Sequence, residues 1–162
     1  MTVEDGTGLS TANSYASVAE ADAYHLLRGN STWTGLDAVK EAALIRATSY
    51  ITGEYSSRWP GYRSSGTQAL DWPRSGALDA DGYYQSGVPV AVKVATIEAA
   101  LLELVTAGTL TEAQDRGGAI VREKVGPIET EYSDGAPTGT IYPAIKLALS
   151  RLVQPVGYLR RG

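Results

Sequence analysis

The feature that most restricts the fold of this chain is an almost continuous apolar helix pattern, PVAVKVATIEAALLELVTAG, at residues 89–108. Pro89 suits the first turn of a helix, and Gly108 suits the position just after its last turn. Apolar residues cover most of the helix circumference and leave a thin polar stripe through Lys93, Thr96 and Glu103, with Glu98 on nearly the opposite side. A helix with so little polar surface is buried on several sides. It therefore forms either the centre of a helical bundle or a wall between subunits.

Local signals predict two helices before this segment. Ser17 and Glu20 have the spacing of a capping box, in which each side chain binds the backbone N–H of the other residue. We therefore expect a helix from about Val18 to Arg28. A second helical pattern, GLDAVKEAALIRATSYITG, is expected to end at Gly53. Its predicted apolar face consists of Leu36, Val39, Ala43, Ala47, Tyr50 and Ile51.

A fourth helix is expected to begin at Pro143, with an apolar seam formed by Ile145, Ala148, Leu149 and Leu152. The 162 residues are enough for one domain with its own core. We therefore predict a mainly α fold, a small helical bundle of about four helices with a long irregular loop and one β-hairpin. The single domain spans residues 1–162, with an N-terminal arm at 1–16 and a flexible C-terminal tail at 154–162.

The predicted long loop covers residues 54–88, where helical periodicity gives way to glycine, proline, serine and aspartate. Two of the three tryptophans lie in it, so we expect it to be ordered. Arginines alternate there with aromatic rings, a combination that single-strand binders use to hold the DNA backbone and stack on bases. The same rings could fold back onto the helical core or contact a protein partner, and we favour these two alternatives. The residues are Arg58, Trp59, Tyr62, Arg63, Trp72 and Arg74.

The predicted β-hairpin covers residues 119–134. Charged and apolar residues alternate on both sides of a Gly-Pro bend, as in two exposed strands. A lone hairpin is only marginally stable in water, so it needs a neighbouring strand or a surface to lie on. That surface could belong to another subunit, by strand addition, or to the chain's own core. The segment is net acidic, with Glu123, Glu129, Glu131 and Asp134 against Arg122 and Lys124.

Composition argues against most enzyme classes. The chain has no cysteine and one histidine, His25, which we interpret as a packed or surface residue. Asp79 and Asp81 begin like a calcium loop, but the later ligand positions are wrong, which favours a plain turn. We therefore expect no catalytic residues, no metal and no cofactor. The absence of a signal peptide or a membrane-spanning run predicts a protein made in the cytosol without membrane contact, and a pI near 5.0 opposes general attraction to DNA.

Several stretches together resemble one family of tailed-phage proteins. They are ANSYASVAEADAYH near the start, RWPGYR followed by QALDWPRSGA, the helix after VPVAVKVATIEAA, and VREKVGPIETEYSDG before YPAIKLALSRL. The chain is similar along residues 12–152 to head-to-tail connector or adaptor proteins. Some members of that family are labelled DnaT-like single-stranded DNA-binding proteins.

The resemblance implies a virion structural protein at the head-tail junction, present in the host cytoplasm before assembly. It would form a twelve-subunit ring that docks on the portal protein, contacts a tail, tail-terminator or second adaptor protein, and extends the channel for packaged double-stranded DNA. Glu123, Glu129, Glu131 and Asp134 would line that channel without binding DNA. The expected partner contacts are Arg58, Trp59, Tyr62, Arg63, Trp72, Arg74, Arg122, Lys124, Tyr158, Arg160 and Arg161. The alternative is a DnaT-like single-stranded DNA-binding protein of phage replication.

Overall fold

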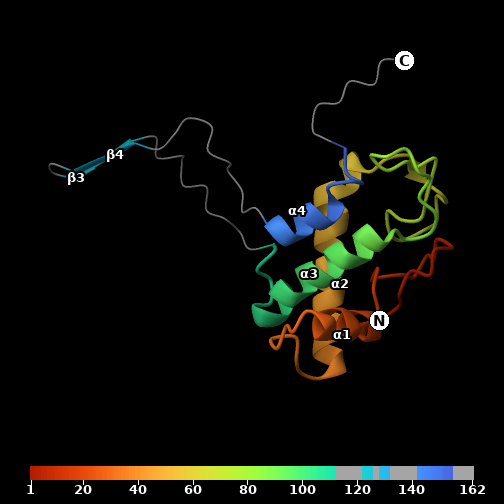
Figure 1. Ribbon diagram of the computed structural model, residues 1–162, viewed down its shortest axis with the longest axis horizontal. Helices are drawn as coiled ribbons and strands as arrows, with labels where there is room; N and C mark the ends of the chain where they lie inside the picture. Colours follow the sequence, from red (N-terminus) through yellow and green to blue (C-terminus); the bar gives the residue numbers. More distant parts are fainter. Residues whose placement is uncertain (112–121, 126–127, 132–141, 155–162) are drawn as a thin grey trace, which may run out of the picture.

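The computed structural model describes residues 1–111, 122–125, 128–131 and 142–154. This part of the chain contains four α-helices, which confirms the predicted mainly α class. They are α1 (Val18–Leu27), α2 (Asp37–Tyr55), α3 (Val90–Val105) and α4 (Pro143–Leu149). As Figure 1 shows, α2 is the long axis of the body, α3 crosses it, and α1 lies near the lower end. Because α3 packs against both α2 and α4, it is the centre of the bundle within one chain.

The predicted start of α1 is confirmed in detail. The Ser17 hydroxyl accepts the backbone N–H of Glu20 at 3.2 Å, and the Glu20 carboxylate accepts the N–H of Ser17 at 2.8 Å. The helix ends before Gly29, whose φ of +66° favours glycine. Lys93 Nζ lies 2.7 Å from the other Glu20 oxygen, so the capping residue also ties α1 to α3.

Two predictions for α2 are wrong. The helix runs through Gly53 to Tyr55, because the Tyr55 ring packs against Trp59 at 5.7 Å and this burial outweighs the roughly 1 kcal/mol cost of a helical glycine. The predicted face is correct for Ala43, Ala47 and Ile51, which are buried, but wrong at its start, since Leu36 and Val39 are exposed. The buried residues are Lys40, Ala43, Leu44, Ala47, Thr48, Ile51 and Tyr55. Lys40 can be buried because its ammonium group binds Asp22 at 2.8 Å.

The predicted polar stripe of α3 is largely buried. The Thr96 hydroxyl donates to the carbonyl of Val92 at 2.9 Å, and the Glu103 carboxylate has partners on α2 and in the following turn. Pro89 is the residue before the helix, not part of its first turn. On α4, Ile145 and Leu149 are buried together with Leu152 in the turn that follows, as the seam predicted.

The N-terminal segment is packed onto this helical body. Glu4 is buried, and its carboxylate accepts the backbone N–H groups of Gly6, Gly8 and Leu9, each at 2.9 Å. The N–H of Glu4 donates to the carbonyl of Ser14 at 2.8 Å. These bonds close residues 4–14 into a compact loop against the core.

The long loop begins at Ser56, after the end of α2, and every residue of it to Val88 is described. It contains a short 3-10 helix, η1 (Ser56–Arg58), and two short antiparallel strands, β1 (Tyr62–Arg63) and β2 (Arg74–Ser75). The sequence did not predict this second strand pair. Register places Tyr62 opposite Ser75 and Arg63 opposite Arg74.

The predicted hairpin is present as β3 (Arg122–Val125) paired antiparallel with β4 (Ile128–Glu131). Its other predicted residues, 119–121, 126–127 and 132–134, lie outside the described part of the chain. The register sets Arg122 opposite Glu131 and Lys124 opposite Glu129. Each basic residue of β3 therefore has a glutamate of β4 as its register partner.

Candidate functional site

The two tryptophans of the loop belong to the core. Trp72 is 0% exposed and Trp59 is 5% exposed, and their rings meet edge to face at 5.8 Å. Trp59 Nε1 donates to the buried carboxylate of Asp71 at 3.1 Å. Neither ring can stack on a base or contact a partner in this conformation. Trp59 and Trp72 are therefore removed from the expected contact residues. Of the alternatives considered for these rings, the structure shows the one in which they fold back onto the helical core.

Three tyrosines of the loop are exposed instead. Tyr62 on β1 is 68% exposed, and Tyr83 and Tyr84 are 71% and 79% exposed. Sequence reasoning selected Tyr62 and missed the other two. The available signal was a pair of adjacent tyrosines in a polar turn, where at most one ring can point inward. Together the three provide aromatic faces that are open to solvent at one end of the molecule.

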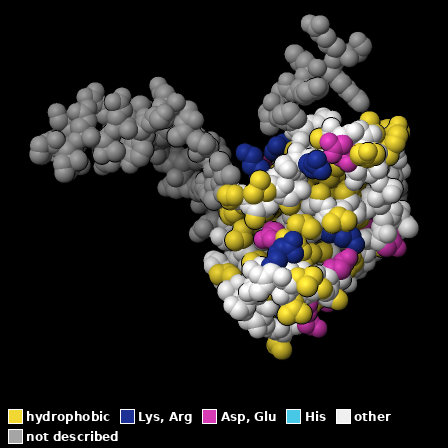
Figure 2. Space-filling view, viewed as in Figure 1, with side chains coloured by type: hydrophobic (Ala, Val, Ile, Leu, Met, Phe, Trp, Pro, Cys, Tyr) yellow, Lys and Arg dark blue, Asp and Glu magenta, His cyan; other side chains and the backbone are white. Residues whose placement is uncertain are grey.

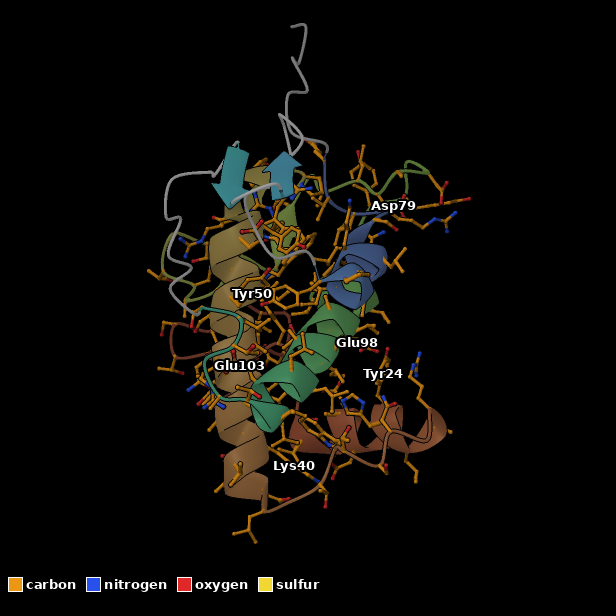
Figure 3. The ribbon with its side chains drawn as sticks, turned by 90° about the vertical axis from the view of Figure 1, so that its left-hand side faces the viewer. Tyr24, Lys40, Tyr50, Asp79, Glu98 and Glu103 are labelled. Atoms are coloured by element: carbon orange, nitrogen blue, oxygen red, sulfur yellow. The ribbon has the colours of Figure 1, made fainter. Side chains whose placement is uncertain are left out.

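Asp79 builds the turn that presents Tyr83 and Tyr84. Its Oδ1 atom accepts the N–H groups of Asp81 at 3.0 Å and Tyr83 at 2.9 Å, and Oδ2 accepts from the Gln85 amide at 2.9 Å. These bonds form a turn that the Asp79 side chain stabilises, as predicted for this segment. Figure 3 shows Asp79 at the end of the body where the loop approaches the C-terminal end of α4.

The loop arginines bind backbone carbonyl oxygens. Arg74 donates to the carbonyls of Pro60 and Gly61, each at 2.8 Å. Arg58 donates to the carbonyl of Gln154 at 3.3 Å, and Arg63 donates to that of Gln68. Burial lowers the pKa of Arg74, against the opposing effect of the Asp71 carboxylate.

Carbonyl groups hold a guanidinium in place without cancelling its charge. Four other basic side chains among the described residues are instead paired with a carboxylate. They are Lys40, Arg46, Lys93 and Arg151. On the face shown in Figure 2, basic and acidic side chains correspondingly lie beside one another among apolar ones. Among described residues, Arg58, Arg63 and Arg74 have no carboxylate within ion-pair distance, although the loop as a whole has as many aspartates as arginines.

A pocket of about 370 Å³ lies between the loop and the turn that follows α4. Residues more than seventy positions apart meet there, because Ala80 N donates to the Arg151 carbonyl at 2.8 Å and Gln154 N donates to the Arg58 carbonyl at 3.0 Å. Its walls include Pro60, Gly61, Gly76, Leu78, Arg151 and Leu152. The carbonyls of Pro60 and Gly61 are the ones that Arg74 binds, so a guanidinium group lies against this wall.

The remaining expected contact residues are placed only in part. For Arg122, Lys124, Glu123, Glu129 and Glu131 the structure gives the strand register. Asp134, Tyr158, Arg160 and Arg161 lie outside the described residues.

His25 is a packed residue, as one of the sequence interpretations held. Its ring lies 4.7 Å from that of Trp33, and Nδ1 is 3.0 Å from the Asn30 amide nitrogen. Within the residues that the structure describes, no cluster of His, Asp or Glu side chains is suited to a metal ion. None of the described helices combines the length and apolarity needed to cross a membrane.

Comparison with known proteins identifies one family. The model of the family described as "Putative DnaT-like ssDNA binding protein" matches residues 1–161. No curated protein matches, and no solved structure matches. The match supports the alternative function of the sequence analysis, not the adaptor interpretation that came first.

Proposed function

This chain belongs to the family of DnaT-like single-stranded DNA-binding proteins, and from that premise we propose that it binds single-stranded DNA through the loop between α2 and α3. The observation that carries the proposal is the combination of open tyrosine faces and carbonyl-bound guanidinium groups in one loop. Single-strand binders without strict sequence preference use this pair of features, with bases on the rings and phosphates on the cations. The proposed activity is binding, without a catalytic step.

Tyr62, Tyr83 and Tyr84 are the stacking residues of this proposal. Their exposure leaves the ring faces free, whereas the tryptophans that the sequence suggested are buried. Stacking of one base on an aromatic side chain contributes about 1–3 kcal/mol. Three such rings are enough to hold a short stretch of unpaired bases.

Local charge favours phosphate at the loop although the chain as a whole does not. The formal net charge of −4 weakens long-range attraction of DNA. Between Ser56 and Leu78, however, the sequence has three arginines and one aspartate, so the excess of positive charge is confined to this part of the loop, since Asp79 and Asp81 follow it. Arg63 is the most accessible of the three arginines, because Arg58 and Arg74 are half-buried. We therefore expect moderate affinity that falls steeply with salt.

The test is fluorescence anisotropy of a labelled oligothymidine of about twenty nucleotides at low salt, about 50 mM. Tyr62→Ala should weaken binding by about 5- to 150-fold, and Tyr62→Phe should preserve it because the ring remains. Arg63→Ala should weaken binding and reduce the slope of affinity against salt by about 0.7. Arg28→Ala, at an exposed arginine directly after the last residue of α1, is the matched control. Absence of binding by the unmodified protein, or equal loss in Tyr62→Ala and Tyr62→Phe, would contradict the proposal.

A second candidate is the head-to-tail adaptor in the virion, with the portal and a tail protein as partners. One observation favours it: apolar side chains stand exposed where α1 is connected to α2. They are Leu26, Leu27, Leu36 and Val39. Clustered exposed apolar residues commonly mark protein interfaces, and a ring of identical subunits needs such surfaces.

Imaging of purified virions at side-chain resolution tests the adaptor candidate, which expects this chain as a ring between portal and tail. Light scattering of the protein with and without portal is the complementary measurement. If the protein is absent from virions but binds oligonucleotides, the adaptor candidate is excluded and single-stranded DNA binding remains.

A further inference from the structure

We propose that the pocket between the loop and the turn after α4 holds one nucleotide of the bound strand, with its base between the apolar walls and its phosphate on Arg151. This inference rests on the proposed function and specifies where the strand is anchored. In the structure Arg151 Nη2 lies 3.2 Å from Asp81 Oδ2. Asp81 therefore competes with phosphate for the guanidinium group that the nucleotide needs.

The shape of the pocket suits a flat ring. Its volume of about 370 Å³ lies within the range of ~300–1,000 Å³ that is usual for small-molecule sites. Pro60, Leu78 and Leu152 supply apolar walls. Gly61 and Gly76 leave the wall between them without side chains, and the Tyr62 ring lies beside Gly76, with Cε1 3.7 Å from the point where a Cβ would stand. A base entering here would meet apolar surface and lie next to an exposed ring.

The charges around the pocket suit a phosphate. Arg151 lines the pocket, and its side chain is mostly exposed. Arg74 and Arg58 are bound to carbonyls of wall residues, on Pro60 and Gly61 and on Gln154. Asp79 also lines the pocket and keeps its negative charge although its oxygens accept hydrogen bonds within the turn, so we place the phosphate at Arg151 and not beside Asp79. A ligand with an apolar ring at one end and an anion at the other matches these surroundings.

Asp81 gives the site a test by gain of function. Its ion pair with Arg151 is exposed, so breaking the pair should lower the free energy of unfolding only slightly. Replacing Asp81 by Asn frees the guanidinium for phosphate and removes one repelling charge. Affinity for single-stranded DNA should then rise by about two- to fivefold, the range set by an exposed ion pair. The gain should disappear in the double variant Asp81→Asn with Arg151→Ala.

The experiment measures binding of a labelled oligothymidine and of an abasic strand of the same length, which has the phosphates but no bases. Leu78→Ala should weaken oligothymidine binding by about tenfold and leave abasic binding unchanged. Its matched control is Leu26→Ala, an exposed leucine on α1. Asp81→Asn should strengthen binding of both strands, whereas Asp37→Asn, which changes the same charge at the far end of α2, should not.

The outcomes separate this inference from the function it rests on. If the unmodified protein binds oligothymidine but Leu78→Ala behaves like Leu26→Ala, the pocket does not hold a base and the inference falls while the function stands. If Asp81→Asn gains no more than Asp37→Asn, Arg151 is not the phosphate contact. If neither strand binds to the unmodified protein, the proposed function fails and the inference fails with it.

Discussion

Arg46 on α2 and Glu103 on α3 form an ion pair in which the carboxylate is buried and the arginine side chain is 38% exposed, with 2.6 Å between Arg46 Nε and Glu103 Oε2. The same carboxylate accepts the backbone N–H groups of Gly108 and Leu110 at 2.8 and 2.9 Å. Burial by itself would raise the pKa of Glu103, but these two N–H groups and Arg46 hold it below its ordinary value of 4.5. One side chain thus joins the two central helices and fixes the turn that ends α3.

Replacing Glu103 by Gln should lower the free energy of unfolding by about 1–3 kcal/mol, because one buried carboxylate oxygen becomes a donor facing other donors. Glu103→Ala should cost more than Glu103→Gln, since both N–H groups and Arg46 then lose their partner entirely. Urea unfolding followed by circular dichroism measures both. Glu54→Gln, an exposed residue of α2, is the control and should change little. A Glu103→Gln protein as stable as that control would contradict the role of this pair.

Stability should fall on acidification in two separate ranges. Burial lowers the pKa of His25 below 6.5, with Glu98 and Asp22 opposing and Arg28 assisting. Below pH 6.5 the unfolded chain therefore takes up a proton that the folded chain refuses, and the free energy of unfolding decreases by at most about 1.4 kcal/mol per pH unit. The pKa values of Glu20 and Glu103 are lowered in the folded chain. Their contribution to the free energy of unfolding is therefore complete above about pH 4.5 and is lost as the pH falls below it.

Urea unfolding at a series of pH values from about 4 to 7.5 separates the two ranges. His25→Phe keeps a ring against Trp33 but cannot take up a proton. In this variant the decrease of the free energy of unfolding above pH 5 should vanish, and the decrease at lower pH should remain. An unchanged profile in His25→Phe would assign the upper range to another group.

Gly61 is required by the geometry of the loop. Its φ is +66°, and a Cβ there would stand 2.3 Å from the carbonyl oxygen of Ser75. Gly61→Ala should therefore disrupt the β1–β2 pairing. The left-handed backbone conformation alone should lower the free energy of unfolding by about 1–2 kcal/mol. Gly66→Ala is the matched control, because nothing lies within 4 Å of its Cβ position. Gly61→Ala should lower the thermal unfolding temperature and weaken oligonucleotide binding. Gly66→Ala should change neither.

Oligonucleotide binding should leave tryptophan fluorescence nearly unchanged. Trp33, Trp59 and Trp72 are all buried, so bases stacked on the exposed tyrosines do not touch them. Iodide, which reaches only exposed rings, should also quench the folded protein far less than the protein in urea. Strong quenching by single-stranded DNA would mean that the loop opens and brings Trp59 or Trp72 to the strand, in conflict with the packing described.

Much of the helical framework was predictable because its signals are local. The capping box of Ser17 and Glu20 places two interacting residues within one turn, and Pro143 marks the first turn of α4 through its own backbone restriction. The apolar circumference of α3 required burial on several sides, and α3 is the central helix. The end of α2 was not predictable in this way, because contact of Tyr55 with a distant loop carries the helix past Gly53.

The candidate site was decided by tertiary structure. From the sequence, Trp59, Trp72, Tyr62, Tyr83 and Tyr84 are all rings in a polar loop, and the adjacency of Tyr83 and Tyr84 is the one local sign that separates exposed from buried rings among them. The separation arises because the two tryptophans pack together within the core while Asp79 holds Tyr83 and Tyr84 in an outward turn. The pocket likewise exists only because residues 60–80 meet residues 150–154. Backbone preference acts over a few neighbouring residues, whereas burial depends on which remote surfaces the folded chain brings together.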